Sequence, residues 1–201
     1  MVVEIENLGQ KPYEPLLIRM REMHERVQRG EPGKVWLVEH EPVYTAGRAT
    51  PPEEITEGVV PTERGGKITY HGPGQLTVYP IVPLPKRDLR DWLQRIEAFG
   101  VRIAQSFGLT AVPSVDGTGV FVNGRKFASI GVHVKRWVNM HGIGINVSIE
   151  NDPWRQVRPC GLSPDMMTDL SSAVGRTISM QEAIESATEA VSLLIKLDDP
   201  L

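Results

Sequence analysis

Residues 119–147 carry the pattern that restricts the fold of this chain most strongly. The run VFV is followed by the turn pair Asn123-Gly124, a long run that ends at Lys135, a break at Arg136-Trp137 and a return run. Asn-Gly pairs favour the two-residue turns that join antiparallel strands, because both residues accept a left-handed backbone. The segment therefore predicts a meander of antiparallel strands.

Helical periodicity is found on both sides of this meander. Apolar residues recur at helical spacing over residues 13–28 and 88–107, and Asp88 is the expected N-cap of the second helix. Ser179 and Glu182 form a capping box that predicts the start of a last helix. The apolar face of the second helix is expected in the core and comprises Leu89, Trp92, Leu93, Ile96, Phe99 and Ile103.

Short strands are expected at residues 35–39, 59–62, 68–70 and 76–82. Strands and helices do not alternate strictly along the chain, so a Rossmann fold is disfavoured. The order predicts an α+β fold, with helices packed against a mixed sheet.

Length and composition predict one ordinary globular domain over residues 1–201. The chain is 40% hydrophobic and 23% charged, and its net charge of −3 comes from interspersed acids and bases. This distribution excludes a broad nucleic-acid footprint and a polybasic membrane anchor. The start MVVEIENLGQ carries acids where an export signal carries bases, and prolines interrupt the most apolar stretch, LTVYPIVPLP. We expect a cytoplasmic protein that binds neither nucleic acid nor membrane.

A glycine-rich segment, RGGKITYHGPGQ, spans residues 64–75. Its glycines would let backbone amides approach a bound group, and Tyr70 and His71 could add side-chain hydrogen bonds. A pair of tight turns would explain the same composition. The segment matches neither a P-loop nor a dinucleotide-binding fingerprint, so a nucleotide is not indicated.

Lys126 begins a predicted strand, and Ala128 and Ile130 lie two and four residues after it. Side chains two residues apart on a strand point to the same face, so regular alternation places the Lys126 ammonium on the apolar face. Such a lysine is either a proton carrier or a strand-end residue whose stem reaches back to water. Ser129 has the opposite parity and so does Gly131. On the return strand, Gly142 and Gly144 indicate either a close ligand or a bulge.

Cys160 is the single cysteine and lies in the loop sequence RPCGLSP, which favours a reactive thiol over a core residue. A thiol with a pKa near 8.5 becomes a competent nucleophile when a nearby cation stabilises its thiolate, and Lys126 would be that cation if the fold joined them. No histidine pair has metal-ligand spacing, so no metal site is predicted. His71 and His141 are better candidates for hydrogen bonding within a site.

Five ordered segments resemble one known family: EHEPVYTAGR, RGGKITYHGPGQLTVYP, GRKFASIGV, HGIGINV and PCGL. They are similar to the octanoyltransferases of lipoate biosynthesis over nearly the whole chain. The resemblance implies the biotin/lipoate protein ligase fold, in agreement with the α+β prediction.

The resemblance also implies an activity. The family transfers an octanoyl group from octanoyl-acyl carrier protein to a lysine of lipoyl domains, in 2-oxoacid dehydrogenase complexes and the glycine cleavage H protein. It uses a cysteine thioester, which matches Cys160, and a lysine, which matches Lys126. No ATP, other cofactor or metal is implied. The acyl-binding residues implied by motif are Arg64, Gly65, Gly66, Lys67, Ile68, Thr69, Tyr70, His71, Ser129, Ile130, Gly131, Gly142, Ile143 and Gly144.

Two positions depart from the family pattern. The family usually has alanine at the position of Gly144 and a smaller aliphatic residue at that of Phe127. Both departures leave the preferred acyl length open.

Three alternatives remain. An ATP-dependent lipoate or biotin ligase would load free acid and need no cysteine. An amidotransferase between lipoyl domains would differ only in its donor. A noncatalytic lipoyl-domain or carrier-protein binding module would be indifferent to the loss of Cys160.

Overall fold

The computed structural model describes residues 3–115, 119–156 and 163–195. Its centre is a mixed seven-stranded sheet in the order β1-β2-β6-β10-β9-β8-β7. The strands are β1 (Glu4–Lys11), β2 (Lys34–His40), β6 (Gln75–Ile81), β7 (Ala111–Pro113), β8 (Gly119–Val122), β9 (Arg125–Lys135) and β10 (Val138–Asn146). β1 and β2 run parallel, and the other neighbouring pairs are antiparallel. The predicted α+β class is confirmed.

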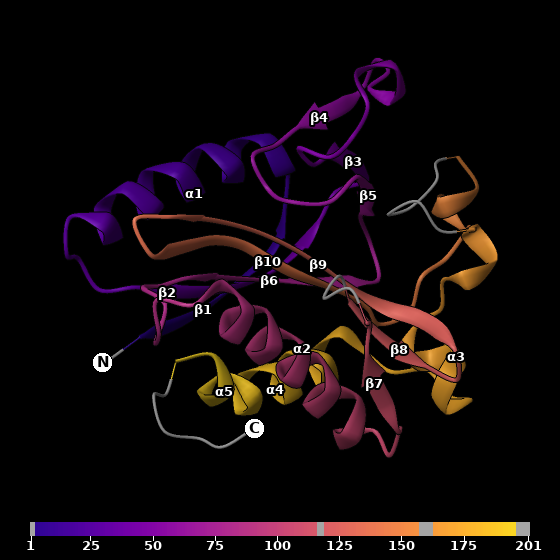
Figure 1. The fold of residues 1–201 in the computed structure, drawn as a ribbon. Helices are drawn as coiled ribbons and strands as arrows, with labels where there is room; N and C mark the ends of the chain where they lie inside the picture. The colour runs from indigo at the N-terminus through magenta and orange to yellow at the C-terminus, as the bar shows by residue number, and fades with distance from the viewer. Residues whose placement is uncertain (1–2, 116–118, 157–162, 196–201) are drawn as a thin grey trace.

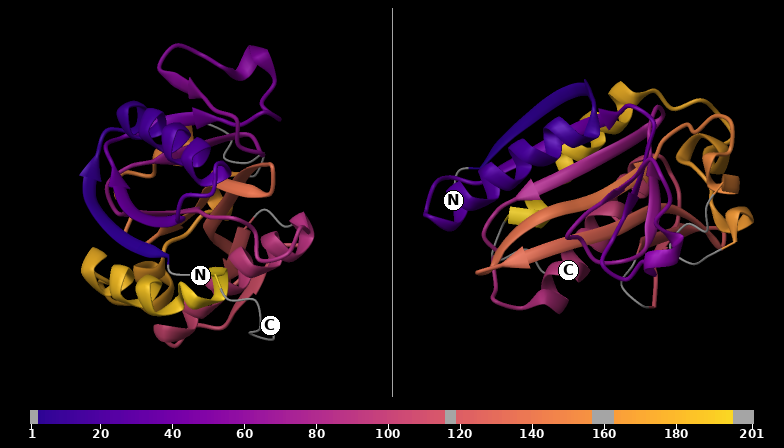
Figure 2. Two further views of the ribbon diagram at one scale, coloured as in Figure 1. Left: turned by 90° about the vertical axis from the view of Figure 1, so that its left-hand side faces the viewer. Right: turned by 90° about the horizontal axis from the view of Figure 1, so that it is seen from above.

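A smaller sheet stands beside the large one and has the order β4-β3-β5 (Figure 1). Its strands are β3 (Val43–Ala46), β4 (Val59–Pro61) and β5 (Ile68–His71). Helix α1 covers one face of the large sheet, and α2, α4 and α5 cover the other (Figures 1 and 2). The helices are α1 (Tyr13–Gln28), α2 (Leu89–Ser106), α3 (Leu170–Val174), α4 (Met180–Ala190) and α5 (Ser192–Ile195), with 3-10 turns η1 (Pro52–Glu54), η2 (Pro153–Gln156) and η4 (Pro164–Met166). Within the described ranges, no helix is long and apolar enough to cross a membrane.

Helix α2 follows the prediction closely at its start and along most of its apolar face. The Asp88 carboxylate accepts hydrogen bonds from the Arg90 amide at 2.8 Å and the Asp91 amide at 3.3 Å, so the predicted N-cap is confirmed. Trp92, Ile96, Phe99 and Ile103 are fully buried against the sheet. The prediction was wrong for Leu89, which is 46% exposed because it lies in the first turn, ahead of the buried part of the helix.

The predicted meander is confirmed as β8, β9 and β10. Asn123 and Gly124 have φ values of 50° and 74°, and Arg136 and Trp137 have values of 52° and 62°. Both pairs are therefore two-residue turns in the left-handed region, which matches the twist of the flanking strands. The strands that the sequence did not indicate are β1, β3 and β7, each short or half exposed and therefore weakly patterned.

All five histidines lie in or at the edge of the interior. His24, His40, His71 and His141 are buried, and His133 is half-buried. Burial disfavours the charged imidazolium and is the largest influence that lowers the pKa of each of them, to about 4 for His40. The folded chain therefore carries these histidines in their neutral form at neutral pH.

We expect the free energy of unfolding to fall as the pH decreases below about 6.5, the unfolded pKa of histidine. Each histidine has a lower pKa in the folded chain, so the unfolded chain binds more protons below that pH. The loss approaches about 1.4 kcal/mol per pH unit for each histidine until its folded pKa is reached. Urea denaturation at several pH values between about 5 and 8 measures this, and a constant free energy over that range would contradict it.

A buried polar contact joins α2 to the sheet. The Trp92 indole Nε1 donates to Asn139 Oδ1 at 2.9 Å. The Asn139 amide nitrogen donates in turn to the carbonyls of Pro80 at 2.6 Å and His141 at 3.0 Å. Both side chains are fully buried, so Asn139 Oδ1 depends on this indole donor.

We therefore expect Trp92→Phe to lower the free energy of unfolding by about 1–3 kcal/mol, because it leaves a buried carbonyl oxygen without its donor. Trp137→Phe is the matched control, since Trp137 is 42% exposed, and its effect should stay within about 0.5 kcal/mol. Urea denaturation of both variants gives the comparison. Equal effects would show that the Asn139 contact contributes nothing specific.

Candidate active site

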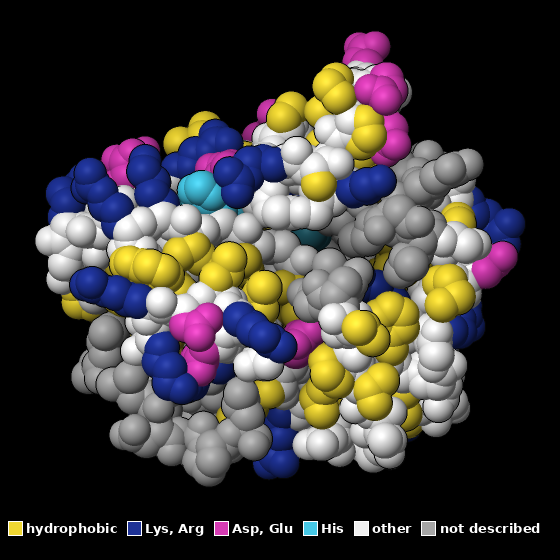
Figure 3. Space-filling view, viewed as in Figure 1, with side chains coloured by type: hydrophobic (Ala, Val, Ile, Leu, Met, Phe, Trp, Pro, Cys, Tyr) yellow, Lys and Arg dark blue, Asp and Glu magenta, His cyan; other side chains and the backbone are white. Residues whose placement is uncertain are grey.

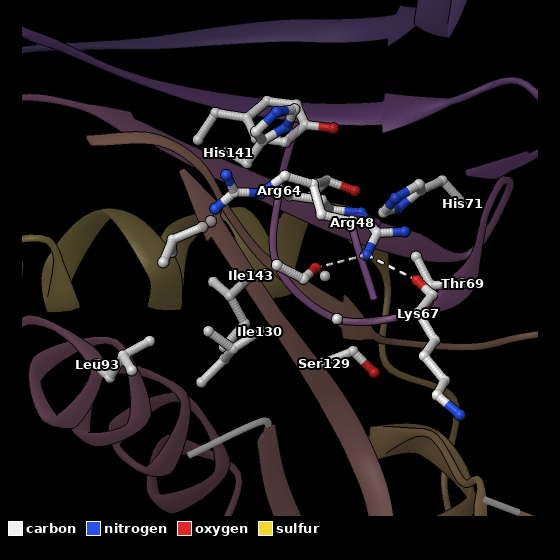
Figure 4. Close-up of a pocket in the computed structure, with 18 of the residues that line it drawn as sticks. Arg48, Arg64, Lys67, Thr69, His71, Leu93, Ser129, Ile130, His141 and Ile143 are labelled. Atoms are coloured by element: carbon white, nitrogen blue, oxygen red, sulfur yellow. Dashed lines mark hydrogen bonds between the residues drawn. The ribbon is translucent and has the colours of Figure 1, made fainter. Parts of the chain in front are cut away.

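A cavity of about 440 Å³ lies beside the central part of strands β9 and β10 (Figures 3 and 4). Residues 64–67, in the loop that follows β4, form its opposite side. This volume is within the range of about 300–1,000 Å³ that is usual for small-molecule sites. Twelve of the fourteen acyl-binding residues predicted from the motifs line it: Arg64, Gly65, Gly66, Lys67, Thr69, His71, Ser129, Ile130, Gly131, Gly142, Ile143 and Gly144. The fold thus brings three distant segments of the sequence to one place.

Glycines form one wall of the cavity. Gly142 pairs with Gly131, and Gly144 pairs with Ser129 across the two strands. A Cβ atom at Gly131 would lie 3.0 Å from Arg64 Cδ, and one at Gly144 would lie 2.9 Å from Gln75 Oε1. The cavity is open because these strand positions carry no side chain.

The opposite wall is held by the buried guanidinium of Arg64. Its Nη1 donates to the carbonyls of Gly65 at 3.0 Å and Lys67 at 2.9 Å (Figure 4). Its Nη2 donates to the carbonyl and the hydroxyl of Thr45, both at 2.8 Å. The Gly65 amide donates to the Val132 carbonyl at 2.9 Å. Residues 64–67 are therefore fixed both to the small sheet and to β9.

His71 is a neutral hydrogen-bond acceptor in this cavity. Its Nδ1 donates to Gln75 Oε1 at 2.7 Å, because the Gln75 amide nitrogen is committed to the Tyr70 carbonyl and Asn146 Oδ1. Burial holds the pKa of His71 well below its usual value, and the ring stacks on Tyr13 with centroids 5.6 Å apart. Nε2 consequently carries a lone pair and no proton.

His141 lies at the back of the same cavity with 1% of its surface exposed. Its φ of 63° is unusual for a residue other than glycine and turns its side chain toward Tyr79 and Glu63. Its Nε2 is 3.7 Å from Glu63 Oε2. Burial lowers the pKa of His141 in spite of this carboxylate, so both histidines are neutral groups of the site.

Apolar side chains gather on one side of the cavity and polar ones on the other. Figure 4 shows Leu93, Ile130 and Ile143 on one side, and Arg48 and His71 on the other. This division suits a ligand with an apolar chain and a polar group.

The sequence did not assign several lining residues to the site: Tyr13, Arg48, Gln75, Thr77, Tyr79, Leu89, Leu93 and Val132. Most of them belong to helix or strand patterns that indicate a core, so periodicity alone could not identify them.

Ile68 and Tyr70 do not line this cavity. They alternate with Thr69 and His71 along β5 and therefore face the other way. Tyr70 packs instead with Trp154 and Met167.

The parity prediction for Lys126 was wrong, because a β-bulge interrupts β9. Phe121 pairs with Lys126, whereas the preceding residue Val120 pairs with Ala128, so Phe127 is an extra residue in the strand. Phe127 and Ala128 both enter the core beneath α2. The bulge thereby turns Lys126 to the opposite face, the one that carries Ser129 and the glycine wall.

The Lys126 side chain is fully buried on that face. Its Nζ lies 5.9 Å from the centroid of the Phe121 ring, and a Cβ atom at Gly119 would lie 3.1 Å from Nζ. The Lys126 carbonyl accepts a hydrogen bond from the Thr168 amide at 3.0 Å, and Met167 bridges to the same residue. Cys160 lies outside the described residues.

Comparison with known proteins gives the family. The model of the lipoyl protein ligase A/B catalytic domain matches residues 11–192. The octanoyltransferase of Saccharophagus degradans is 37% identical over 182 residues, which cover 88% of this chain and 84% of that protein. The octanoyltransferase of Laribacter hongkongensis is 40% identical over 177 residues, which cover 84% and 86%.

Solved structures show the same fold at low identity. A lipoate-protein ligase A bound with ATP is similar with a TM-score of 0.77 and 16% identity, over 96% of this chain and 85% of that one. The biotin protein ligase of Aquifex aeolicus is similar with a TM-score of 0.57 and 13% identity, over 96% and 68%. The predicted biotin/lipoate ligase-like fold is confirmed. The chain belongs to the lipoyl protein ligase A/B catalytic domain family and is an enzyme of its octanoyltransferase group.

Proposed function

We propose that this chain transfers an octanoyl group from octanoyl-acyl carrier protein to a lysine of lipoyl domains. The acceptors are the lipoyl domains of 2-oxoacid dehydrogenase complexes and the glycine cleavage H protein. Residues 1–201 act as one catalytic domain, and the cytoplasm remains the expected location. The observation that carries the proposal is the glycine-walled cavity, which has an apolar side and a polar side and is lined by the motif residues.

The cavity supports an acyl ligand through its shape and lining. The chain of an octanoyl group would run along the glycine wall and against Leu93, Ile130 and Ile143. Each methylene removed from water in this way is worth about 0.8 kcal/mol. The carbonyl end would lie among polar groups, where a neutral His71 can accept a hydrogen bond but cannot donate one from Nε2.

The reaction begins with Cys160 and Lys126 in this proposal. The Lys126 ammonium stabilises the Cys160 thiolate, whose sulfur attacks the octanoyl carbonyl carbon. The bond from that carbon to the carrier sulfur then breaks, and the leaving thiolate takes a proton from Lys126. The product of this half-reaction is a thioester on Cys160.

The second half-reaction returns the proton. The acceptor lysine amine attacks the thioester carbon, the bond to the Cys160 sulfur breaks, and an amide forms. Neutral Lys126 accepts the proton that the amine loses, which restores the ammonium and thiolate. A thioester is already activated, so the conversion to an amide needs no ATP.

Two features of the described residues support Lys126 in this role. It is a fully buried lysine on the face that carries the cavity wall. The low dielectric of such a buried position strengthens the attraction between an ammonium and a nearby anion. The segment that follows Cys160 in the sequence contacts it through Met167 and Thr168.

An ATP-dependent ligase remains the main competing function. The similarity to lipoate and biotin ligases is a similarity of fold, at 16% identity or less in the two structures compared. Loading of free octanoate only in the presence of ATP would favour a ligase. An amidotransferase would instead use octanoylated lipoyl domain as its donor.

We expect the enzyme to gain the mass of one octanoyl group when it is mixed with octanoyl-acyl carrier protein, and to lose it to apo lipoyl domain. Cys160→Ala should show no adduct, because the attacking sulfur is gone. Lys126→Met should slow adduct formation by about 100-fold or more, since proton transfer by a positioned group is worth about 10²–10⁴. Intact-protein mass spectrometry against time measures both rates.

Lys135→Met is the matched control, because Lys135 is exposed at the far end of the same strand. It should form the adduct at the rate of the unmodified enzyme. An adduct that persists in Cys160→Ala would overturn the thioester mechanism.

We also expect Gly131→Ala to shorten the preferred acyl chain. The added methyl group would lie 3.0 Å from Arg64 Cδ and 3.3 Å from the Gly65 carbonyl, in the space between the two walls. One misplaced methyl group in an apolar site weakens transition-state binding by about 1–3 kcal/mol. The value of kcat/KM for the octanoyl donor should therefore fall at least about tenfold. The butanoyl donor is the internal control and should lose much less. Equal losses for both chain lengths would show that Gly131 does not border the acyl chain.

A further inference from the structure

Two leucines of α2 form the apolar end of the cavity. Leu89 and Leu93 both line it, and they are four residues apart, so they are neighbours on one face of the helix. Leu93 is half-buried and packs against the core that contains Ile130 and Ile143. Leu89 is 46% exposed. This end of the cavity therefore passes from an inner wall at Leu93 to an outer rim at Leu89.

A second hollow lies directly behind these leucines. A groove of about 1200 Å³ runs along the outer surface of α2 and β7, and Leu89 and Leu93 line it as well as the cavity. The groove is also lined by charged side chains, those of Arg90, Glu97 and Arg102. The two leucines therefore separate the apolar end of the cavity from a partly charged groove on the surface.

The turn of α2 that carries the leucines is held in place by its neighbours. The Asp88 carboxylate caps the start of the helix. Trp92 is fully buried directly before Leu93, and its indole nitrogen donates to Asn139 at 2.9 Å. A shift of this turn away from the sheet would break that buried contact. The space at the end of the cavity is therefore set by the size of the two leucine side chains.

The proposed function places the reacting end of the acyl group at the opposite end of the cavity. Lys126 precedes Ser129 on β9. Figure 4 shows Ile130 and Ile143 between Ser129 on one side and Leu93 on the other. An acyl chain that begins near Lys126 and follows these apolar side chains therefore ends at Leu93.

The part of the cavity that is lined by Tyr79 and His141 suits the end of an acyl chain less well. The Tyr79 hydroxyl is hydrogen-bonded to His40 Nε2 at 2.9 Å. His141 Nε2 is 3.7 Å from a carboxylate oxygen of Glu63. Polar groups of this kind gain nothing from contact with a methyl group. The terminal methyl group is better accommodated at the leucines.

We propose that Leu89 and Leu93 set the longest acyl chain that the enzyme accepts. The inference rests on the proposed function and specifies its substrate. A chain that ends at Leu93 is removed from water along its whole length. A longer chain has to displace the leucines or turn toward Tyr79, and it therefore binds less well. Replacement of both leucines by alanine would join the cavity to the groove, so that a longer chain could extend past α2.

The test is a competition between two donors in the first half-reaction. Octanoyl- and dodecanoyl-acyl carrier protein are mixed in equal excess over the enzyme without acceptor, and intact-protein mass spectrometry measures the two acyl-enzymes. We expect Leu89→Ala/Leu93→Ala to raise the ratio of dodecanoyl to octanoyl adduct at least about tenfold, because one methylene in an apolar pocket changes the rate by about 10–200-fold. The ratio does not depend on the fraction of enzyme that is folded. The rate with dodecanoyl donor alone should also increase.

Two single variants complete the comparison. Val101→Ala is the matched control, because Val101 is a half-buried residue of α2 that lines the groove and does not line the cavity. It should leave the ratio within about twofold. Leu93→Phe adds volume at the end of the cavity and should shift the preference from octanoyl toward hexanoyl donor. Alanine is a better helix former than leucine, so α2 should persist in both alanine variants.

The outcomes separate this inference from the proposed function. If the double variant transfers octanoyl but its ratio is unchanged, the acyl chain ends elsewhere and the inference is wrong, while the transferase stands. A ratio that rises only because the octanoyl rate falls, or that rises equally in Val101→Ala, also overturns the inference. If the unmodified enzyme is acylated by neither donor, the proposed function fails and this inference fails with it.

Discussion

The candidate site depends on the buried guanidinium of Arg64. Its two terminal nitrogens join residues 64–67 to one another and to β3, with four hydrogen bonds to Gly65, Lys67 and Thr45. The Gly65 amide joins the same loop to β9. A glycine-rich loop has a large conformational entropy, and these charged donors offset it. Without them the loop could collapse onto the glycine wall, because no side chain of Gly131 or Gly142 would oppose it.

Two local irregularities of the meander turn an ordinary sheet into a site. The bulge at Phe127 moves that ring into the core and turns Lys126 to the face of the cavity. The left-handed backbone of His141 turns a second polar side chain to the same face. Both features depart from regular strand geometry in the region where the chemistry is proposed, and strain of this kind is common at functional sites.

Helix α2 serves the core and the site at the same time. Trp92, Ile96 and Phe99 anchor it to the sheet, which fixes the position of Leu93 at the cavity. The buried core contact of α2 thus fixes the apolar side of the cavity relative to the sheet.

The sequence by itself determined α1, α2, the start of α4, the meander and the motif residues, because periodicity, capping and turn chemistry are local properties. It also predicted twelve residues of one cavity, since the motifs carry family information. The tertiary structure decided the direction of Lys126 and the place of Leu93, and it separated Tyr70 from the cavity. A one-residue bulge reverses every side chain beyond it, and a residue such as Leu89 satisfies helical periodicity whether it meets the core or a cavity. Only the packing of distant segments distinguishes those cases.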